Sequence, residues 1–454
     1  MTMIGKTAAS TLARQVRDAI RDTASTFTIP GVQVAWSCDG VVDHLEHGTI
    51  GAGRPAPVTA DTRFPLASVT KVFTATLAMQ LVGDGTLDLD APIGDTLPPG
   101  RCREVLGDVT LRHLLTHTSG LEDDPAETEG RRGSPGQYLR LCTRERLFAP
   151  GEHFSYANAG YVAVGHLIEA ASGESWADAV QAYLLDPIEV RGGFFLSEPL
   201  PPGLMADGHV RRPDGEIAGL PPSPGEGRAW APCCGLALNA QGLLALVRLH
   251  LADGRTPLGF PLLDAALARE MRAPAVPVPD PTFADAWGLG WAVLRSGSSP
   301  VPDGRWFGHD GDDAGWTARV RASADGEFAI AMLASCVPVD EEWGRLVGAL
   351  QELGVDVGQA SPPALPARTV PIDPAVAGGY ENGGGRLWVV PDEGGYALTD
   401  GRERVPLRAA GPDRCVGVPG EPGDVPFLVG FLRDDDGAVG HLFQRGRVSR
   451  RVAA

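Results

Sequence analysis

Basic charge, long apolar runs and cofactor motifs are all scarce in this sequence of 454 residues. Its 39 lysines and arginines stand against 57 acidic residues, which leaves a net charge of −18 at pH 7. Nucleic acids and anionic membranes repel such a chain, so we expect neither as a main partner. No apolar run approaches the roughly 18 residues that cross a bilayer. Zinc-type cysteine spacings and Gly-x-Gly phosphate loops are also absent, so the sequence predicts no metal and no cofactor.

A disulfide framework is missing as well. The seven cysteines are odd in number, scattered and in one case adjacent, which favours reduced thiols. They are Cys38, Cys102, Cys142, Cys233, Cys234, Cys336 and Cys415. In the first 20 residues Arg14, Arg17 and Asp18 interrupt any apolar run, so we interpret them as an amphipathic surface helix and not as an export signal. Both observations predict a cytoplasmic protein.

The order of the expected elements indicates an α+β fold. A hairpin over residues 31–48 follows the N-terminal helix. Helical periodicity dominates from about residue 66 to 270, and strands return between 287 and 335. We therefore expect an antiparallel sheet assembled from both ends of this region, with a helical lobe inserted between its strands.

A stretch rich in proline and alanine divides the chain into two domains. We expect a first domain over residues 1–358, a linker over residues 359–371 and a second domain over residues 372–454. The second domain consists of short strands and turns, which predicts a small antiparallel β-barrel or sandwich.

Ser68 and Lys71 are the first candidate catalytic pair. Residues three apart share one face of a helix, so the lysine amine can reach the serine hydroxyl. The helix N-terminus would stabilise an oxyanion formed at Ser68. If burial lowers the pKa of Lys71, its neutral amine can accept the serine proton. Alone, the pattern is more typical of an N-capping serine and a surface lysine.

Tyr156 and Asn158 form a second candidate group, two residues apart in a predicted tight turn. The phenol could transfer a proton and the amide could hold an acyl group. A packed turn tyrosine followed by a helix-capping asparagine explains the same residues equally well.

A third group, His309-Asp310-Gly311, begins an apolar strand. Its glycine permits close approach of a ligand to the backbone. An edge strand here could pair with an extended peptide and donate the N–H of Asp312 to an oxyanion. The alternative is a polar hairpin loop with a solvated histidine.

The three motifs together resemble those of the penicillin-recognising serine enzymes, which include class C beta-lactamases, D,D-carboxypeptidases, D-stereospecific aminopeptidases and esterases. In that superfamily S-x-x-K at a helix start precedes Y-x-N, and K-T-G or H-x-G follows on an edge strand. Here Tyr156 follows Ser68 by 88 residues and precedes His309 by 153, near the family's intervals of about 90 and about 150. The resemblance covers residues 10–353. It implies a beta-lactamase/transpeptidase-like domain.

The resemblance also implies a role for each motif residue. Ser68 would be the acylated nucleophile, Lys71 its proton partner and Tyr156 the second member of the proton relay. Asn158 would hold the substrate amide. The N–H groups of Ser68 and Asp312 would form the oxyanion hole.

The third motif departs from the pattern that binds penicillins. The lysine and threonine of K-T-G receive a substrate carboxylate. Here a mostly neutral His309 and an anionic Asp310 stand before Gly311. An ester, thioester or amide with an amine nearby suits this site better, so beta-lactamase is not the expected main activity.

Penicillin-binding-protein-type thioesterases combine an H-x-G motif with an appended lipocalin-like domain, and this sequence resembles them in length and architecture. Such enzymes take a peptide from the carrier protein of a nonribosomal peptide synthetase, and the amine of the peptide closes a head-to-tail ring. We therefore expect a peptidyl substrate on a carrier protein, released by macrocyclisation or hydrolysis. The resemblance also implies a cavity-facing arginine near the C-terminus, for which we choose Arg450. A solvated basic tail is the alternative.

Other functions stay open. A D-stereospecific aminopeptidase or esterase of the same superfamily is the second candidate, because it shares the acyl-enzyme. Loss of catalysis is disfavoured because all three motifs are intact. His113 and His117 have the spacing of two metal ligands on a helix, but HLLTH lacks the acidic base of H-E-x-x-H, so a structural pair is favoured.

Overall fold

Nine antiparallel strands form the central sheet of the first domain, in the order β3-β2-β1-β14-β13-β12-β11-β10-β9. The computed structural model describes residues 3–97, 99–123, 133–141, 146–190, 193–195, 203–220, 227–367, 370–420 and 425–452. The strands are β1 (Gly31–Cys38), β2 (Val41–Gly51), β3 (Arg54–Pro57), β9 (Val276–Pro277), β10 (Ala286–Trp287), β11 (Ala292–Leu294), β12 (Trp306–Asp313), β13 (Trp316–Ser323) and β14 (Phe328–Ala334). Strand β1 pairs with β14, with Val32 opposite Ala334, so the sheet is built from both ends of the domain as predicted.

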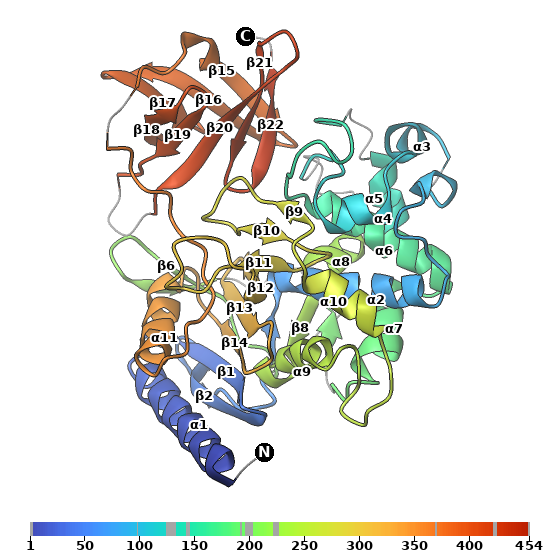
Figure 1. The fold of residues 1–454 in the computed structure, drawn as a ribbon, viewed down its shortest axis with the longest axis vertical. Coiled ribbons are helices and arrows are strands. Elements are labelled where there is room, and N and C mark those ends of the chain that lie inside the picture. The colour runs from blue at the N-terminus through green and yellow to red at the C-terminus, as the bar shows by residue number, and fades with distance from the viewer. Residues whose placement is uncertain are drawn as a thin grey trace.

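Alternate residues of β14 belong to two separate cores, because neighbouring side chains of a strand point to opposite faces. Ile330 lies in the core shared with α1 (Met3–Ala24) and α11 (Asp340–Glu352), and Ala331 lies in the core of the helical lobe. Figure 1 shows α1 and α11 together on one side of the sheet, away from the helical lobe. The helices of that lobe are α2 (Thr70–Gly83), α3 (Arg101–Leu106), α4 (Leu111–Leu115), α5 (Pro135–Leu141), α6 (Asn158–Ser172), α7 (Trp176–Val180), α8 (Ala231–Cys234), α9 (Ala240–Leu251) and α10 (Ala265–Arg272).

Short elements complete the first domain. They are a 3₁₀ turn η1 (Ala67–Val69), the small sheet of β4 (Phe64–Pro65), β8 (Leu236–Leu238) and β5 (Phe194–Phe195), and the hairpin of β6 (His209–Arg211) and β7 (Ile217–Gly219).

Helix α2 is the buried axis of the helical lobe. All its residues from Thr70 to Met79 are buried, and it packs against α6, α8 and η1. Lys71 lies within this run and is 0% exposed. Burying an ammonium costs free energy unless it has polar partners, so Lys71 needs such partners around it.

The second domain is a closed barrel of eight antiparallel strands, which confirms the predicted barrel. Its strands are β15 (Gly378–Asn382), β16 (Gly385–Asp392), β17 (Gly395–Thr399), β18 (Arg404–Gly411), β19 (Arg414–Gly417), β20 (Phe427–Arg433), β21 (Val439–Gln444) and β22 (Arg447–Val452). Buried side chains such as Tyr380, Val389 and Leu442 pack together as its core. The domain boundaries at residues 358 and 371 stay a prediction.

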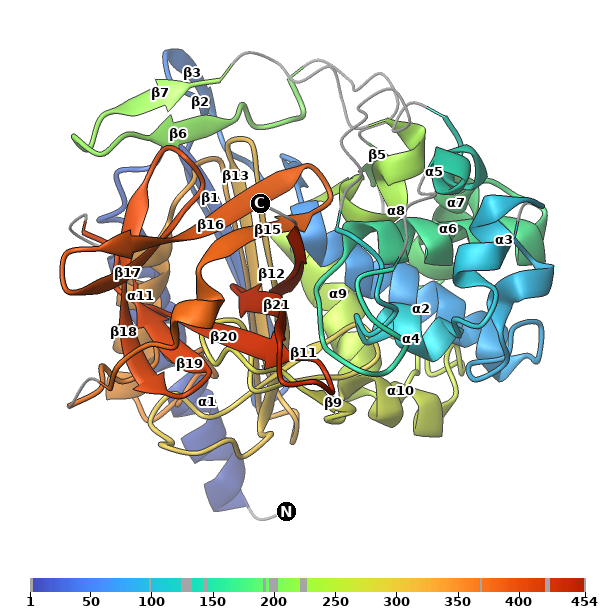
Figure 2. The same ribbon diagram turned by 90° about the horizontal axis from the view of Figure 1, so that it is seen from above.

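The barrel binds the first domain through the segment that leads into α6. The turn between β21 and β22 places the carbonyl of Gly446 2.8 Å from the backbone N of Tyr156, and the N–H of Val448 donates to Ser155 Oγ at 3.1 Å. Figures 1 and 2 both show this side of the barrel beside the β9–β10 edge of the sheet. Among the described residues, no helix has the length and apolar character that a bilayer crossing needs.

Candidate active site

Ser68 lies in the 3₁₀ turn η1, which leads directly into α2. The helix itself begins two residues later than the sequence suggested. Ser68 is partly exposed, while its neighbours from Thr62 to Met79 are buried. A ligand can therefore reach Ser68 within an otherwise buried segment. Ala67 precedes it with φ of 46°, a left-handed conformation that costs energy in a residue with a side chain.

Lys71 donates hydrogen bonds from its Nζ to Ser68 Oγ and to the carbonyl of Cys233, each at 3.0 Å. The same nitrogen lies 5.0 Å from the centre of the Tyr156 ring. Burial alone would lower the pKa of Lys71, but the neighbouring Tyr156 and Cys233 groups raise it above its ordinary value. The lysine is therefore held as an ammonium, so the condition for a neutral amine, a pKa lowered by burial, is not met.

An ammonium cannot accept the serine proton, so the base must be another group. Tyr156 is the candidate, because its ring lies against Lys71. The Tyr156 side chain is 5% exposed and is enclosed by rings: His117 at 4.2 Å, Phe283 at 5.3 Å and Trp287 at 5.8 Å between centroids. The site excludes most water from this pair, which strengthens their electrostatic interaction.

Asn158 begins α6 and is partly buried. Ala157 before it is extended, with φ of −136° and ψ of 118°, which lets Tyr156 and Asn158 lie on the same side of the chain. The structure thus brings the second motif beside the first.

His309 reaches the same place from strand β12. Its ring is 3% exposed and lies 5.3 Å from Trp287 and 6.4 Å from Tyr156 between centroids. Burial, together with the charge of Lys71, lowers the pKa of His309 to about 3. Nδ1 lies 2.7 Å from the carbonyl oxygen of Asp310 and so carries the ring proton, which leaves Nε2 as a buried acceptor with no partner among the described residues.

Gly311 is required where it stands because β12 lies directly against η1. A Cβ at this position would come within 2.4 Å of the carbonyl oxygen of Leu66 and 3.1 Å of the backbone N of Ser68. This close approach brings the backbone around Asp312 to the nucleophile. Strand β11 pairs with β12 only at residues 306–308, so the rest of β12 offers an open edge to an extended peptide.

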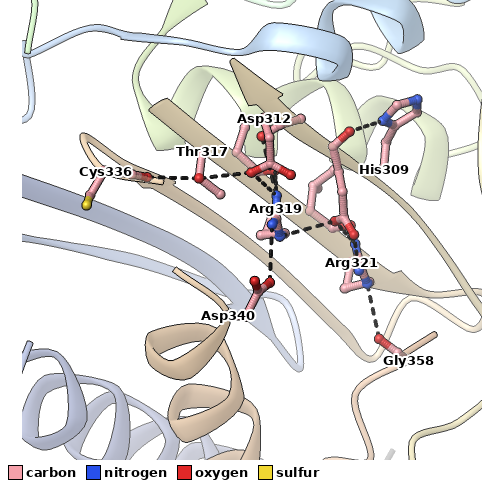
Figure 3. A network of polar contacts seen from close by, with 12 residues as sticks. His309, Asp312, Thr317, Arg319, Arg321, Cys336, Asp340 and Gly358 are labelled. Atoms are coloured by element: carbon pink, nitrogen blue, oxygen red, sulfur yellow. Dashed lines mark hydrogen bonds and ion pairs between the residues drawn. The ribbon is translucent and has the colours of Figure 1, made fainter. Parts of the chain in front are cut away.

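The reverse face of β12 carries a network of ion pairs, drawn in Figure 3. The Asp310 carboxylate accepts hydrogen bonds from Arg321 at 2.6 and 2.8 Å, and Asp312 accepts one from Arg319 at 3.0 Å. Burial would raise the pKa of Asp310, but Arg321 and Arg319 lower it to about 2. The two guanidinium groups thus compensate its negative charge on the face of β12 away from His309.

Arg450, the predicted cavity-facing arginine, contacts the other domain. Its guanidinium donates to the backbone carbonyl of Arg146, beside the segment that supports the barrel. Arg447, next to the hairpin turn, lies over the Tyr156 ring instead, with its Cζ 5.3 Å from the centroid. It also donates from Nε to Asp123 at 2.8 Å.

His113 and His117 have different partners, so they do not form a shared metal site. His113 Nδ1 accepts the N–H of Thr110 in a capping box, whereas His117 Nδ1 accepts the N–H of Ala157 and the ring stacks on Tyr156. Within the described part of the chain, no three histidine, cysteine or acidic side chains gather as a metal site would require. The position of His117 beside Tyr156 had no signal in the sequence other than its spacing from His113.

The chain matches known proteins over most of its length. A family model described as beta-lactamase matches residues 16–351. Penicillin-binding protein 4 of Amycolatopsis lactamdurans is 32% identical over 382 residues, which cover 81% of this chain and 96% of that protein. Esterase EstB of Burkholderia gladioli is 41% identical over 167 residues, which cover 33% of this chain and 42% of that protein.

Solved structures extend the similarity to both domains. The crystal structure of SurE has a TM-score of 0.83 and 33% identity, and covers 99% of this chain and 100% of SurE. The crystal structure of SurE with D-Leu has a TM-score of 0.81 and 32% identity, with coverage of 98% and 99%.

Proposed function

This chain belongs to the beta-lactamase family of serine hydrolases and acyltransferases, and from that premise we propose that it transfers a peptidyl acyl group to Ser68 and releases it by macrocyclisation or hydrolysis. The proposed substrate is a peptidyl ester or thioester, presented by the carrier protein of a nonribosomal peptide synthetase. The observation that carries this proposal is the Ser68–Lys71–Tyr156 group, which faces a neutral His309 where penicillin enzymes place a cation.

Acylation begins with removal of the Ser68 proton by the Tyr156 phenolate. The serine oxygen then attacks the carbonyl carbon of the substrate, and the carbonyl oxygen gains the negative charge. The N–H groups of Ser68 and Asp312 stabilise that oxyanion. The tetrahedral intermediate collapses, the bond to the leaving thiol or alcohol breaks, and Tyr156 returns the proton to the leaving group. Lys71 keeps its proton throughout and stabilises the phenolate electrostatically.

Deacylation repeats these steps with a new nucleophile. Tyr156 takes a proton from an amine or from water, and the nucleophile displaces Ser68 from the acyl carbon. An amine of the same peptide gives a ring, and water gives a linear acid. His309 Nε2 can accept a hydrogen bond from the incoming N–H, and Asn158 holds the amide next to the reacting carbonyl.

The barrel supports the cyclase form of this proposal. Its β21–β22 turn lies against Tyr156 through Gly446, and Arg447 covers the ring. A covered site favours an amine that is already bound over bulk water. The chain also resembles SurE over both domains, and SurE has been crystallised with D-Leu, which supports a substrate that contains a D-residue.

We also propose a cytoplasmic location, where such carrier proteins act. All the cysteines that the structure describes are free and buried, which fits a reducing compartment.

The test is a reaction with a linear peptidyl thioester that ends in a D-residue, read by mass spectrometry, with Ser68→Ala as the control. The proposal predicts a Ser68-dependent product that has lost the thiol and gained no water. A linear acid alone would reject cyclisation for that substrate and retain the acyl-enzyme. An unchanged thioester would reject the proposed substrate class.

An esterase or D-stereospecific aminopeptidase is the second candidate. The 41% identity to EstB favours the esterase, although it spans only a third of the chain. Simple esters and D-amino acid amides, offered to the same two proteins, distinguish this candidate. Turnover of these substrates with no reaction of the peptidyl thioester would favour it.

A further inference from the structure

Asp123 lies at a junction between the catalytic motif and the barrel. Its Oδ1 accepts the backbone N–H of Asn158 at 2.9 Å, and its carbonyl oxygen accepts the N–H of Ala159 at 3.1 Å. Its Oδ2 accepts a hydrogen bond from Arg447 Nε at 2.8 Å, and its own N–H donates to Asn382 Oδ1 at 2.9 Å. Four bonds thus join Asp123 to helix α6 and to two strands of the barrel.

Helix α6 needs this help because of its own sequence. The first N–H groups of any helix lack intrahelical acceptors, and a side chain at the N-cap usually supplies one. The N-cap of α6 is Ala157, which has no such side chain. Asp123 supplies the missing acceptors from elsewhere in the chain, and its negative charge at the helix N-terminus is favourable.

The same bonds fix the surroundings of Tyr156. Arg447 is held by Asp123 and lies over the tyrosine ring. The Asn382 amide donates from Nδ2 to the carbonyl of Val448 at 2.8 Å, while its Oδ1 accepts the N–H of Asp123. The amide thus links Asp123 to strand β22. Asp123 is only 20% exposed in its side chain. A shift of Asp123 would therefore move the start of α6 and the arginine over Tyr156 together.

We propose that Asp123 is a positioning residue for the Tyr156–Asn158 motif, through which the barrel sets the geometry of catalysis. The inference rests on the proposed serine chemistry but not on the identity of the peptide. In this proposal the barrel helps to position the catalytic groups and does not only cover the active site.

The experiment measures acylation of Ser68 by a p-nitrophenyl ester, with p-nitrophenol release followed over a range of ester concentrations. In Asp123→Ala, the maximal acylation rate is expected to fall by about 10- to 100-fold, because a small misplacement of catalytic groups has that effect. The half-saturating concentration should change much less, because no substrate contact is lost. Asp123→Asn should recover part of the rate, since an amide oxygen can still accept the N–H of Asn158.

Two further variants separate positioning from general destabilisation. Asp90→Ala removes an aspartate that pairs with Arg112, outside the catalytic group, and should acylate at the wild-type rate. Asn382→Ala removes one of the two barrel contacts of Asp123, leaves Asp123 in place and should slow acylation in the same direction. It also tests the inference if Asp123→Ala does not fold.

Wild-type acylation rates in folded Asp123→Ala or in Asn382→Ala would overturn the inference. Equal slowing in Asp90→Ala, in proportion to a lowered melting temperature, would overturn it as well. A wild-type protein without any Ser68-dependent burst gives a different result: it would remove the proposed serine chemistry and this inference with it.

Discussion

The carbonyl of Gly446 accepts the backbone N–H of Tyr156 at 2.8 Å, so the barrel supplies a hydrogen bond to the proposed base in the other domain. Phe283 packs against Gly446 and also meets the Tyr156 ring edge-on, at 5.3 Å between centroids. The candidate base therefore sits between elements of two domains. Its position depends on how the barrel is bound.

The first prediction concerns Gly311. In Gly311→Ala the new methyl would meet the carbonyl oxygen of Leu66 at 2.4 Å, so β12 must move away from η1. We expect acylation of Ser68 to fall by about 100-fold and the free energy of unfolding to fall by about 1–3 kcal/mol. Gly348→Ala in α11, where a Cβ meets no atom within 4 Å, is the control. Acylation at the wild-type rate in Gly311→Ala would contradict the close approach.

A second prediction concerns the arginines of the barrel. Arg447→Ala removes the cation over Tyr156 and the partner of Asp123, so acylation should slow by about 10-fold or more. Arg450→Ala removes a hydrogen bond to a backbone carbonyl and should change the rate by less than about twofold. Burst kinetics of both variants make the comparison. The reverse order would restore Arg450 as the cavity-facing arginine.

His309 makes stability depend on pH. Its pKa is about 3 in the folded protein and about 6.5 in the unfolded chain, so between these values only the unfolded state binds the proton. The protein therefore loses stability through this group as the pH falls below about 6.5. The loss amounts to about 2 kcal/mol at pH 5.

His309→Gln tests this sign, because glutamine stays neutral. Urea unfolding at pH 7 and at pH 5 should show a stability loss smaller by about 2 kcal/mol in the variant than in the wild type. Identical losses in the two proteins would show that His309 is not buried in its neutral form. His117 and His250, also buried with lowered pKa values, contribute equally to both proteins.

The motif positions that the sequence predicted do come together, but their protonation and pairing needed the structure. The order and spacing of Ser68, Tyr156 and His309 were enough to place them at one site, because a shared fold fixes where each motif falls. The sequence left the charge on Lys71 open, since it depends on the distance to Tyr156.

Cross-strand partners could not be predicted from the sequence. Asp310 is neutralised by Arg321 because β13 pairs with β12 in a register that sets Gly308 opposite Arg321. The sequence gives no direct signal of that register. Likewise Arg447, not Arg450, faces Tyr156, because the hairpin turn at Gly446 fixes which residue of β22 comes first.

A fourth prediction concerns penicillin. His309→Lys places a cation where the K-T-G enzymes have one, so labelling by a fluorescent penicillin should increase about 10-fold over the wild type, the effect of one added charge pair of about 1.4 kcal/mol. His309→Gln is the neutral control and should label no better than the wild type. Strong labelling of the wild-type protein would mean that a neutral His309 does not disfavour the penicillin carboxylate.

The central claim is that Ser68 carries the peptidyl group as an ester. Intact-protein mass spectrometry after brief mixing with a peptidyl thioester tests it most directly, followed by digestion to find the modified peptide. The account predicts an added mass equal to the peptidyl acyl group, on the peptide that contains Ser68, and none in Ser68→Ala. Release of product from the thioester with no adduct in the wild type, or an adduct that persists in Ser68→Ala, would contradict it.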